Sequence, residues 1–268
     1  MANDFSSRDI ERCWTAVAGH RLHHREAGEG PPVVLVHGLG VASSYMIPLA
    51  QRLASQFRVY IPEFPGFGES SKPEKVLDVT SMAASLLEWM DIVGVAQPAL
   101  FGNSLGCQII VRAIEMQPDV AACAILQGPT VDREARTIRQ QVFRLLRDAP
   151  HERTAMLGVA IRDYHKAGPW RMLQTLRYAL ADDVENAVPH VDTPVMVLRG
   201  TRDPVAPDRW TRELARRLPH SVHRTIECGP HAVHFTMPDE VAAVILPFFE
   251  WHLMRTKAEP RRAGLDSR

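Results

Sequence analysis

The sequence predicts an α/β fold built on a mostly parallel, doubly wound sheet of about eight strands with helices around it. Two observations predict it. Short apolar runs rich in β-branched residues recur along the chain, and helical patterns separate them. Apolar runs without polar alternation are typical of strands that are buried on both faces of a parallel sheet. Strands and helices in alternation favour one doubly wound domain.

The individual elements follow from these runs in chain order. Gly19-His20 separates two alternating stretches, 14–17 and 21–25, which predict an N-terminal antiparallel hairpin. Strands buried in the sheet are expected at 32–36, 57–61, 99–101, 122–126, 194–198 and, more weakly, 221–226. Helices between them are expected at 47–55, 80–93, 105–117, 207–218 and 238–252.

The interval between the expected strands 122–126 and 194–198 contains no clear strand. It has helical patterns instead, at 133–147, 152–165 and 170–181, with breaks at Ala149-Pro150 and Gly168-Pro169. A structureless loop of this length is improbable. We therefore expect an α/β core at 1–129 and 191–255, a helical cap at 130–190 and, because it is polar and aperiodic, a disordered tail at 256–268.

The composition narrows the class of function. Lys plus Arg and Asp plus Glu number 31 each, so no net positive field favours nucleic acid or an anionic membrane. The chain has neither a secretory signal pattern nor an apolar stretch near the roughly 20 residues of a membrane helix. The four cysteines form no CxxC pair, which argues against a metal site or a disulfide framework. These features predict a cytoplasmic protein.

The strongest chemical signal is Gly102-Asn-Ser104-Leu-Gly106, a G-x-S-x-G directly after an expected strand and before a helical pattern. A strained turn in this context projects a serine hydroxyl, and the flanking glycines remove side chains that would collide with the neighbouring strand and helix. The pattern therefore predicts Ser104 as a nucleophile. The alternative is a glycine-rich turn with a serine that caps the helix.

A second loop is expected to complete an oxyanion site. His37-Gly-Leu39-Gly40 ends the first buried strand, where the chain turns sharply. We assign the two donors to the backbone N–H groups of Leu39 and Leu105, the second of which lies at a helix N-terminus. His37 is interpreted as a structural histidine whose hydrogen bonds hold this loop.

The remaining two catalytic groups are expected on later loops. Asp203 follows the expected strand 194–198, and His231 follows the last strand in a Gly-Pro loop, so the order Ser, Asp, His matches that of a triad on such sheets. Asp203 would orient the histidine and stabilise the imidazolium. Asp132 competes with Asp203 for the role of the acid. His234 competes with His231 for the role of the base and otherwise lines or supports the pocket.

These motifs together resemble the α/β-hydrolase superfamily over roughly residues 10–253. The matching segments are the His37-Gly38 loop, 62–70, 102–106, 200–207 and 229–238. Members usually have Asp where this chain has Glu63, glycine where it has Pro230, and often Glu where it has Thr236. Many also have another glycine where this chain has Cys107, which is expected to be a buried helix residue.

The resemblance implies a hydrolase and leaves its reaction open. Related dehalogenases and epoxide hydrolases carry Asp at the position of Ser104, and lipases with an HGGG loop differ from the HGLG found here. Hydrolysis of a small ester or lactone is our first hypothesis. C–C bond hydrolysis of dienoic diketones is the second, because the Gly-Asn-Ser-Leu-Gly elbow resembles that of meta-cleavage hydrolases, although the glycine-proline-glycine after the histidine is missing. Amide hydrolysis and cofactor-free peroxidation also remain open.

A different class is a non-catalytic ligand receptor on the same fold, against which the intact set of Ser104, Asp203 and His231 argues. The triad chemistry needs neither metal nor organic cofactor. The expected partner is a small-molecule substrate, with no nucleic acid or membrane, and a homodimer is allowed. We predict that the substrate contacts Tyr45, His234, Trp170 and Val205, with Met156 and Leu173 as further candidates. For each of these residues, ordinary core packing is the alternative.

Overall fold

The computed structural model describes residues 10–258 and confirms the predicted fold class. Eight strands form one sheet in the order β1-β2-β4-β3-β5-β6-β7-β8. The antiparallel pairs are β1 with β2 and β2 with β4, and all other pairs are parallel. The strands are β1 (Glu11–Val17), β2 (His20–Ala27), β3 (Pro32–Val36), β4 (Arg58–Pro62), β5 (Ala99–Asn103), β6 (Cys123–Gln127), β7 (Val195–Gly200) and β8 (Ser221–Ile226).

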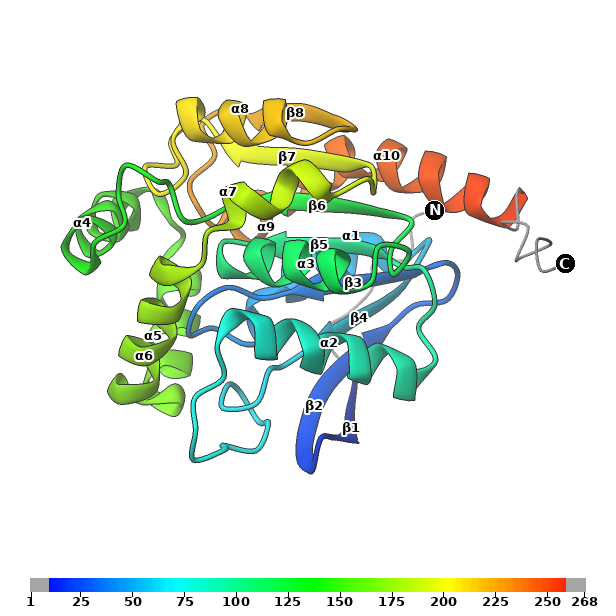
Figure 1. Cartoon of the computed structure of the whole chain (residues 1–268), viewed down its shortest axis with the longest axis horizontal. Helices are drawn as coiled ribbons and strands as arrows, with labels where there is room; N and C mark the ends of the chain where they lie inside the picture. Colours follow the sequence, from blue (N-terminus) through cyan, green and yellow to red (C-terminus); the bar gives the residue numbers. More distant parts are fainter. Residues whose placement is uncertain (1–9, 259–268) are drawn as a thin grey trace, which may run out of the picture.

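Helices cover both faces of this sheet (Figure 1). Alternate residues of β3 show why: Val34 and Val36 belong to one apolar cluster, whereas Val33 and Leu35 belong to the other. The first cluster packs against α2 (Val79–Val93), α3 (Leu105–Met116) and α8 (Asp208–Arg217). The second packs against α1 (Ile47–Leu53) and α10 (Pro238–Ala258).

The segment between β6 and β7, here called the insertion, is helical as the sequence predicts. It contains α4 (Ile138–Asp148), α5 (Thr154–Ala167), α6 (Pro169–Ala181) and the short α7 (Val184–Ala187). Helices α4 to α6 gather at one end of the sheet, beside the turn that leads from β5 into α3 (Figure 1). Because parallel strands share a direction, their loops meet at this end, where ligands bind in open α/β sheets.

The last helix is longer than the sequence indicates. Its apolar pattern ends near His252, but α10 continues through Ala258, so the expected disordered tail does not begin at residue 256. Backbone hydrogen bonds can extend a helix beyond the end of its apolar pattern, and the polar residues 256 and 257 belong to α10. The rest of the predicted tail, 259–268, lies outside the described residues. No helix in the described part of the chain is long and apolar enough to cross a membrane.

Candidate active site

Ser104 occupies a strained turn between β5 and α3. Its φ of 56° and ψ of −117° lie in a region that residues other than glycine rarely adopt. The turn is tight because β5, β3 and α3 approach closely. A Cβ on Gly102 would lie 2.7 Å from the backbone of Gly106, and a Cβ on Gly106 would lie 2.4 Å from the carbonyl oxygen of Val36. The glycine spacing therefore has the steric cause that the sequence predicts.

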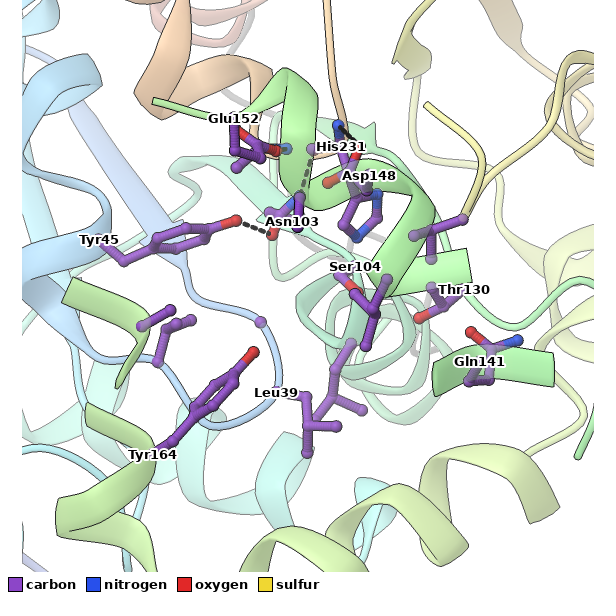
Figure 2. Close-up of a pocket in the computed structure, with 18 of the residues that line it drawn as sticks. Leu39, Tyr45, Asn103, Ser104, Thr130, Gln141, Asp148, Glu152, Tyr164 and His231 are labelled. Carbon is purple, nitrogen blue, oxygen red and sulfur yellow. Dashed lines mark hydrogen bonds between the residues drawn. The ribbon is translucent and has the colours of Figure 1, made fainter. Parts of the chain in front are cut away.

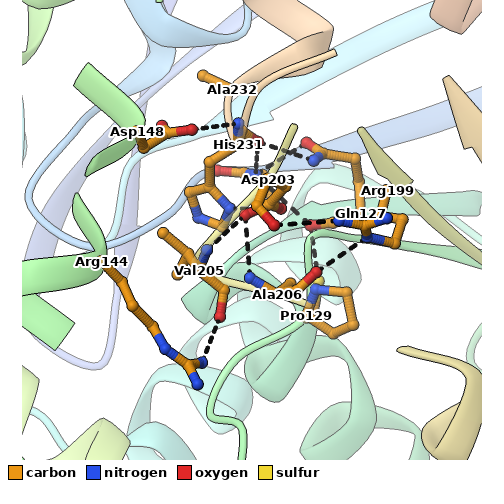
Figure 3. Close-up of polar contacts among 12 residues, drawn as sticks. Gln127, Pro129, Arg144, Asp148, Arg199, Asp203, Val205, Ala206, His231 and Ala232 are labelled. Carbon is orange, nitrogen blue, oxygen red and sulfur yellow. Dashed lines mark hydrogen bonds and ion pairs between the residues drawn. The ribbon is translucent and has the colours of Figure 1, made fainter. Parts of the chain in front are cut away.

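The structure brings His231 and Asp203 together. His231 Nδ1 lies 2.9 Å from Asp203 Oδ2, while Asp203 Oδ1 accepts hydrogen bonds from the backbone N–H groups of Val205 and Ala206 (Figure 3). These two bonds fix the carboxylate so that its second oxygen faces the imidazole. Both side chains are buried. A carboxylate in this place orients the histidine and stabilises its protonated form.

The loops that carry this pair pack directly on each other. A Cβ on Gly200, at the end of β7, would lie 2.0 Å from the carbonyl oxygen of Gly229. The N–H of Arg202 also donates to that carbonyl oxygen, at 2.9 Å. The loops that carry Asp203 and His231 are therefore in direct backbone contact.

His231 also lies beside Ser104. Both side chains line one cavity, and Figure 2 shows the imidazole ring next to the serine. The Ser104 hydroxyl has no hydrogen bond within the described part of the chain, and catalytic hydrogen bonds are often long before substrate binds. Burial lowers the pKa of His231, but the charge and hydrogen bond of Asp203 outweigh that effect and raise it to about 9.

His234 has a different environment. It is fully buried, and its Nδ1 lies 2.8 Å from Gln127 Oε1. The same amide oxygen accepts a bond from Asn103 Nδ2, and Gln127 Nε2 donates to the carbonyl oxygen of His231. Burial, helped by the nearby charge of His231, lowers the pKa of His234 to about 3. His234 is thus a neutral histidine that supports the His231 loop indirectly, through Gln127.

Asp132 pairs with arginines and not with His231. Its buried carboxylate receives Arg144 Nη2 at 2.7 Å and Arg209 Nη2 at 2.5 Å. Arg144 also donates to the carbonyl oxygen of Val205 (Figure 3). Asp132 therefore ties helix α4 of the insertion to helix α8 of the core, and it has no contact with the imidazole.

The loop after β3 lies against the serine turn. A Cβ on Gly38 would lie 3.3 Å from Ser104 Cβ, and Leu39 and Leu105 both line the cavity. Leu105 is the first residue of α3, so its N–H has no acceptor within the helix. His37 is structural, as expected: it is buried, its Nδ1 lies 2.9 Å from the carbonyl oxygen of Gly38, and its Nε2 accepts from the N–H of Phe64.

The cavity around Ser104 and His231 measures about 300 Å³. Its walls are mainly apolar and come from both the core and the insertion: Leu39, Val131, Leu145, Met156, Ile161 and Leu176. Tyr45 and Val205, which we predict to contact substrate, both line it, and the Tyr45 hydroxyl donates to Asn103 Oδ1 at 3.2 Å. His234 and Trp170 do not reach it. Trp170 lies near the start of α6 with 64% of its surface exposed.

Two carboxyl groups of the insertion are part of this site although the sequence analysis did not select them. Asp148 and Glu152 line the cavity and contact the backbone of the His231 loop (Figure 2). The only sequence signal is an acid pair four residues apart across the Ala149-Pro150 break. Nothing in that pattern indicates which loop of the core the pair would meet.

Comparisons with known proteins identify the family of the chain. The model of the family described as "Alpha/beta hydrolase family" matches residues 33–244. The chain is 25% identical to the pimeloyl-[acyl-carrier protein] methyl ester esterase of Stenotrophomonas maltophilia, over 85% of this chain and 96% of that one. It is 24% identical to the pyrrolizixenacetamide deacetylase of Xenorhabdus hominickii, over 82% and 91%.

A solved esterase from Thermogutta terrifontis superposes with a TM-score of 0.76, covering 90% of this chain and 99% of that one at 23% identity. That level of identity supports the fold alone. The family match, in contrast, extends from β3 into α10 and includes the serine turn and both loops that carry Asp203 and His231. This chain belongs to the alpha/beta hydrolase family and is a hydrolase.

Proposed function

We propose that the protein hydrolyses a small, mainly apolar ester or lactone by acyl transfer, with Ser104 as nucleophile, His231 as general base and Asp203 as its orienting acid. One observation carries the proposal: Ser104 and His231 line the same apolar cavity, and His231 is paired with Asp203 behind it. The esterase and deacetylase among the relatives support acyl transfer as the reaction class.

The mechanism begins when Ser104 Oγ attacks the carbonyl carbon and His231 Nε2 takes the hydroxyl proton. The N–H groups of Leu39 and Leu105 stabilise the resulting oxyanion. The bond to the leaving alcohol then breaks, and that oxygen receives the proton from His231. Water next attacks the acyl-enzyme and gives its proton to His231, after which the bond to Oγ breaks, Ser104 regains a proton and the acid leaves.

The walls of the cavity favour apolar acyl groups. None of its described lining residues is lysine or arginine, and two lining residues are the acids Asp148 and Glu152. A substrate carboxylate would lose its hydration there and meet two acidic side chains, with no lysine or arginine among the described lining residues to pair with it. Dienoic diketones carry such a carboxylate, so the cavity disfavours C–C hydrolysis relative to ester or lactone hydrolysis. We propose that the insertion acts as a cap over this cavity, and that the enzyme acts on a small molecule in the cytoplasm.

A fluorophosphonate probe tests the proposal. We expect it to modify Ser104 of the unaltered protein, and we expect Ser104→Ala to lose both the modification and the turnover of p-nitrophenyl esters. Mass-spectrometric mapping of the probe to another residue would contradict the assignment. Comparison of p-nitrophenyl esters, lactones and dienoic diketones then ranks the bond types.

A further inference from the structure

Two carboxyl groups hold the His231 loop from the side of the insertion. Asp148 Oδ1, at the end of α4, accepts the backbone N–H of His231 at 2.9 Å. Glu152, four residues later, accepts the backbone N–H of Ala232 at 2.5 Å and the hydroxyl of Thr236 at 2.6 Å. Together they satisfy two consecutive backbone donors and one side-chain donor of the loop.

Both residues are buried: Asp148 is 4% exposed and Glu152 is 8% exposed. Burial raises the pKa of Asp148, and burial together with the charge of Asp148 raises that of Glu152 to about 8. Ionisation of both carboxyl groups is unfavourable, because two adjacent negative charges repel each other in a buried environment. Near neutral pH Glu152 therefore keeps a proton, and the negative charge of Asp148 beside it is one cause of this.

That negative charge faces the proposed base. The ionisable groups around the pair are His231 and Asp203 on the core loops and Tyr45 at the end of η2 (Ser43–Tyr45). Burial raises the pKa of the Tyr45 phenol, which therefore stays neutral. The charge of Asp148 favours the protonated form of His231, and Glu152 adds to this once it ionises, both in addition to the larger effect of Asp203. The imidazolium that forms during acyl transfer is thus stabilised from two sides.

We propose that Asp148 and Glu152 are positioning residues for His231, so that the insertion supplies part of the support of the general base as well as a wall of the cavity. The proposal rests on the proposed function of His231. Asp148 fixes the backbone of the base and adds a second negative charge near its ring. Glu152 holds the next residue and, through its proton, keeps the two carboxyls together.

Asp148→Asn separates charge from geometry, because an asparagine oxygen can still accept the His231 N–H. We expect kcat to fall about tenfold while KM for a p-nitrophenyl ester changes less than about twofold, since the charge acts in the transition state. The acid limb of the kcat/KM profile should move to lower pH, because His231 loses a negative neighbour. An acid limb that coincides with that of the unaltered enzyme would overturn the proposal.

Glu152 is tested by a conservative and a disruptive variant. Glutamine mimics the protonated acid, since its oxygen can accept the Ala232 N–H and its amide can donate to Asp148. We therefore expect kcat in the order unaltered enzyme, Glu152→Gln, Glu152→Ala, with the alanine variant lower by about tenfold or more. Equal kcat for the glutamine and alanine variants would contradict a positioning role.

Asp163→Asn is the matched control. Asp163 is another buried acid of the insertion, bonded to Ser44 Oγ at 3.1 Å and to Arg162. It has no bond to the His231 loop, so its loss should leave the acid limb of the pH profile in place. A shift as large as that of Asp148→Asn would mean that any buried acid of the insertion has this effect, and the proposal would fail.

A readout without turnover separates this inference from the proposed function. The far-downfield NMR resonance of the His231 Nδ1 proton reports the bond to Asp203 and titrates with the ring. We expect its midpoint at lower pH in Asp148→Asn, and also in Glu152→Gln should the first variant fail to fold. An unchanged midpoint overturns the inference even if Ser104 reacts with the fluorophosphonate. Conversely, lack of probe reaction at Ser104 overturns the proposed function, whatever the titration shows.

Discussion

The surroundings of His231 and His234 differ although the two residues are three positions apart and both are buried. His231 faces Asp203 and the carboxyls of the insertion, which raise its pKa to about 9 despite burial. His234 faces an amide and aromatic rings, including Tyr45 at 4.5 Å between centroids, and burial lowers its pKa to about 3. The comparison shows that two buried histidines have opposite pKa shifts because different charges neighbour them.

Replacement of the two histidines should give the largest difference. His231→Ala removes the proposed base, and we expect kcat to fall by roughly 10⁵–10⁶. His234→Ala removes a brace, so it should lower the free energy of unfolding by about 1–3 kcal/mol with a much smaller loss of kcat. Steady-state kinetics and denaturant unfolding check both. If His234→Ala were the more damaging to kcat, the two roles would have to be exchanged.

The acids near this loop should differ in a similar way. Asp203→Asn keeps the shape of the side chain but removes its negative charge and no longer favours the correct tautomer of His231. We therefore expect kcat to fall by roughly 10⁴. Asp132→Asn breaks bonds to Arg144 and Arg209, so it should cost about 1–3 kcal/mol of stability while activity at low temperature remains. Kinetics and thermal unfolding of both variants test this. The opposite pattern would place the catalytic acid after β6.

The raised pKa of His231 predicts a pH profile. The base must be neutral, so kcat/KM should rise about tenfold per pH unit and level off near pH 9. Stability should change in the opposite direction. The protonated histidine contributes stability that is complete below its unfolded pKa near 6.5 and is lost as pH rises through about 9. A kcat/KM that is flat from pH 6 to 9 would contradict this assignment.

The smallest expected effect concerns the insertion. Leu145→Ala enlarges the cavity wall, whereas Trp170→Ala changes an exposed position outside the cavity. We expect only the first to shift kcat/KM among p-nitrophenyl esters of different acyl length, by a few-fold, as one or two methylenes are worth in an apolar pocket. Equal selectivity changes in both variants would mean that the insertion rearranges when substrate binds.

The sequence predicts what depends on local steric rules and on strand order. The sequence can single out Ser104 because its glycines, strand and helix are contiguous, and it can single out Asp203 and His231 because parallel strands bring their loops to one end of the sheet. The sequence does not reveal contacts made when the insertion folds back on the core. Asp148 lies 83 positions from His231, and Glu152 lies 80 positions from Ala232, the residues whose backbone N–H groups they accept. Helical periodicity predicts which residues share one face of a helix, but it does not predict what that face packs against. For this reason the sequence predicts Trp170 at the cavity, whereas the structure places it outside.

The contact of Gly200 with Gly229 limits how this enzyme can be altered. The spacing of the loops that carry Asp203 and His231 depends on two main chains in contact, with no side chain between them that could be shortened or enlarged to adjust it. A library that randomises these loops should therefore tolerate changes at exposed Arg202 far better than at Gly200. The same contact holds the two loops at a fixed separation. We therefore expect any new activity selected on this scaffold to keep the spacing of Asp203 and His231 and to change the residues of the cavity instead.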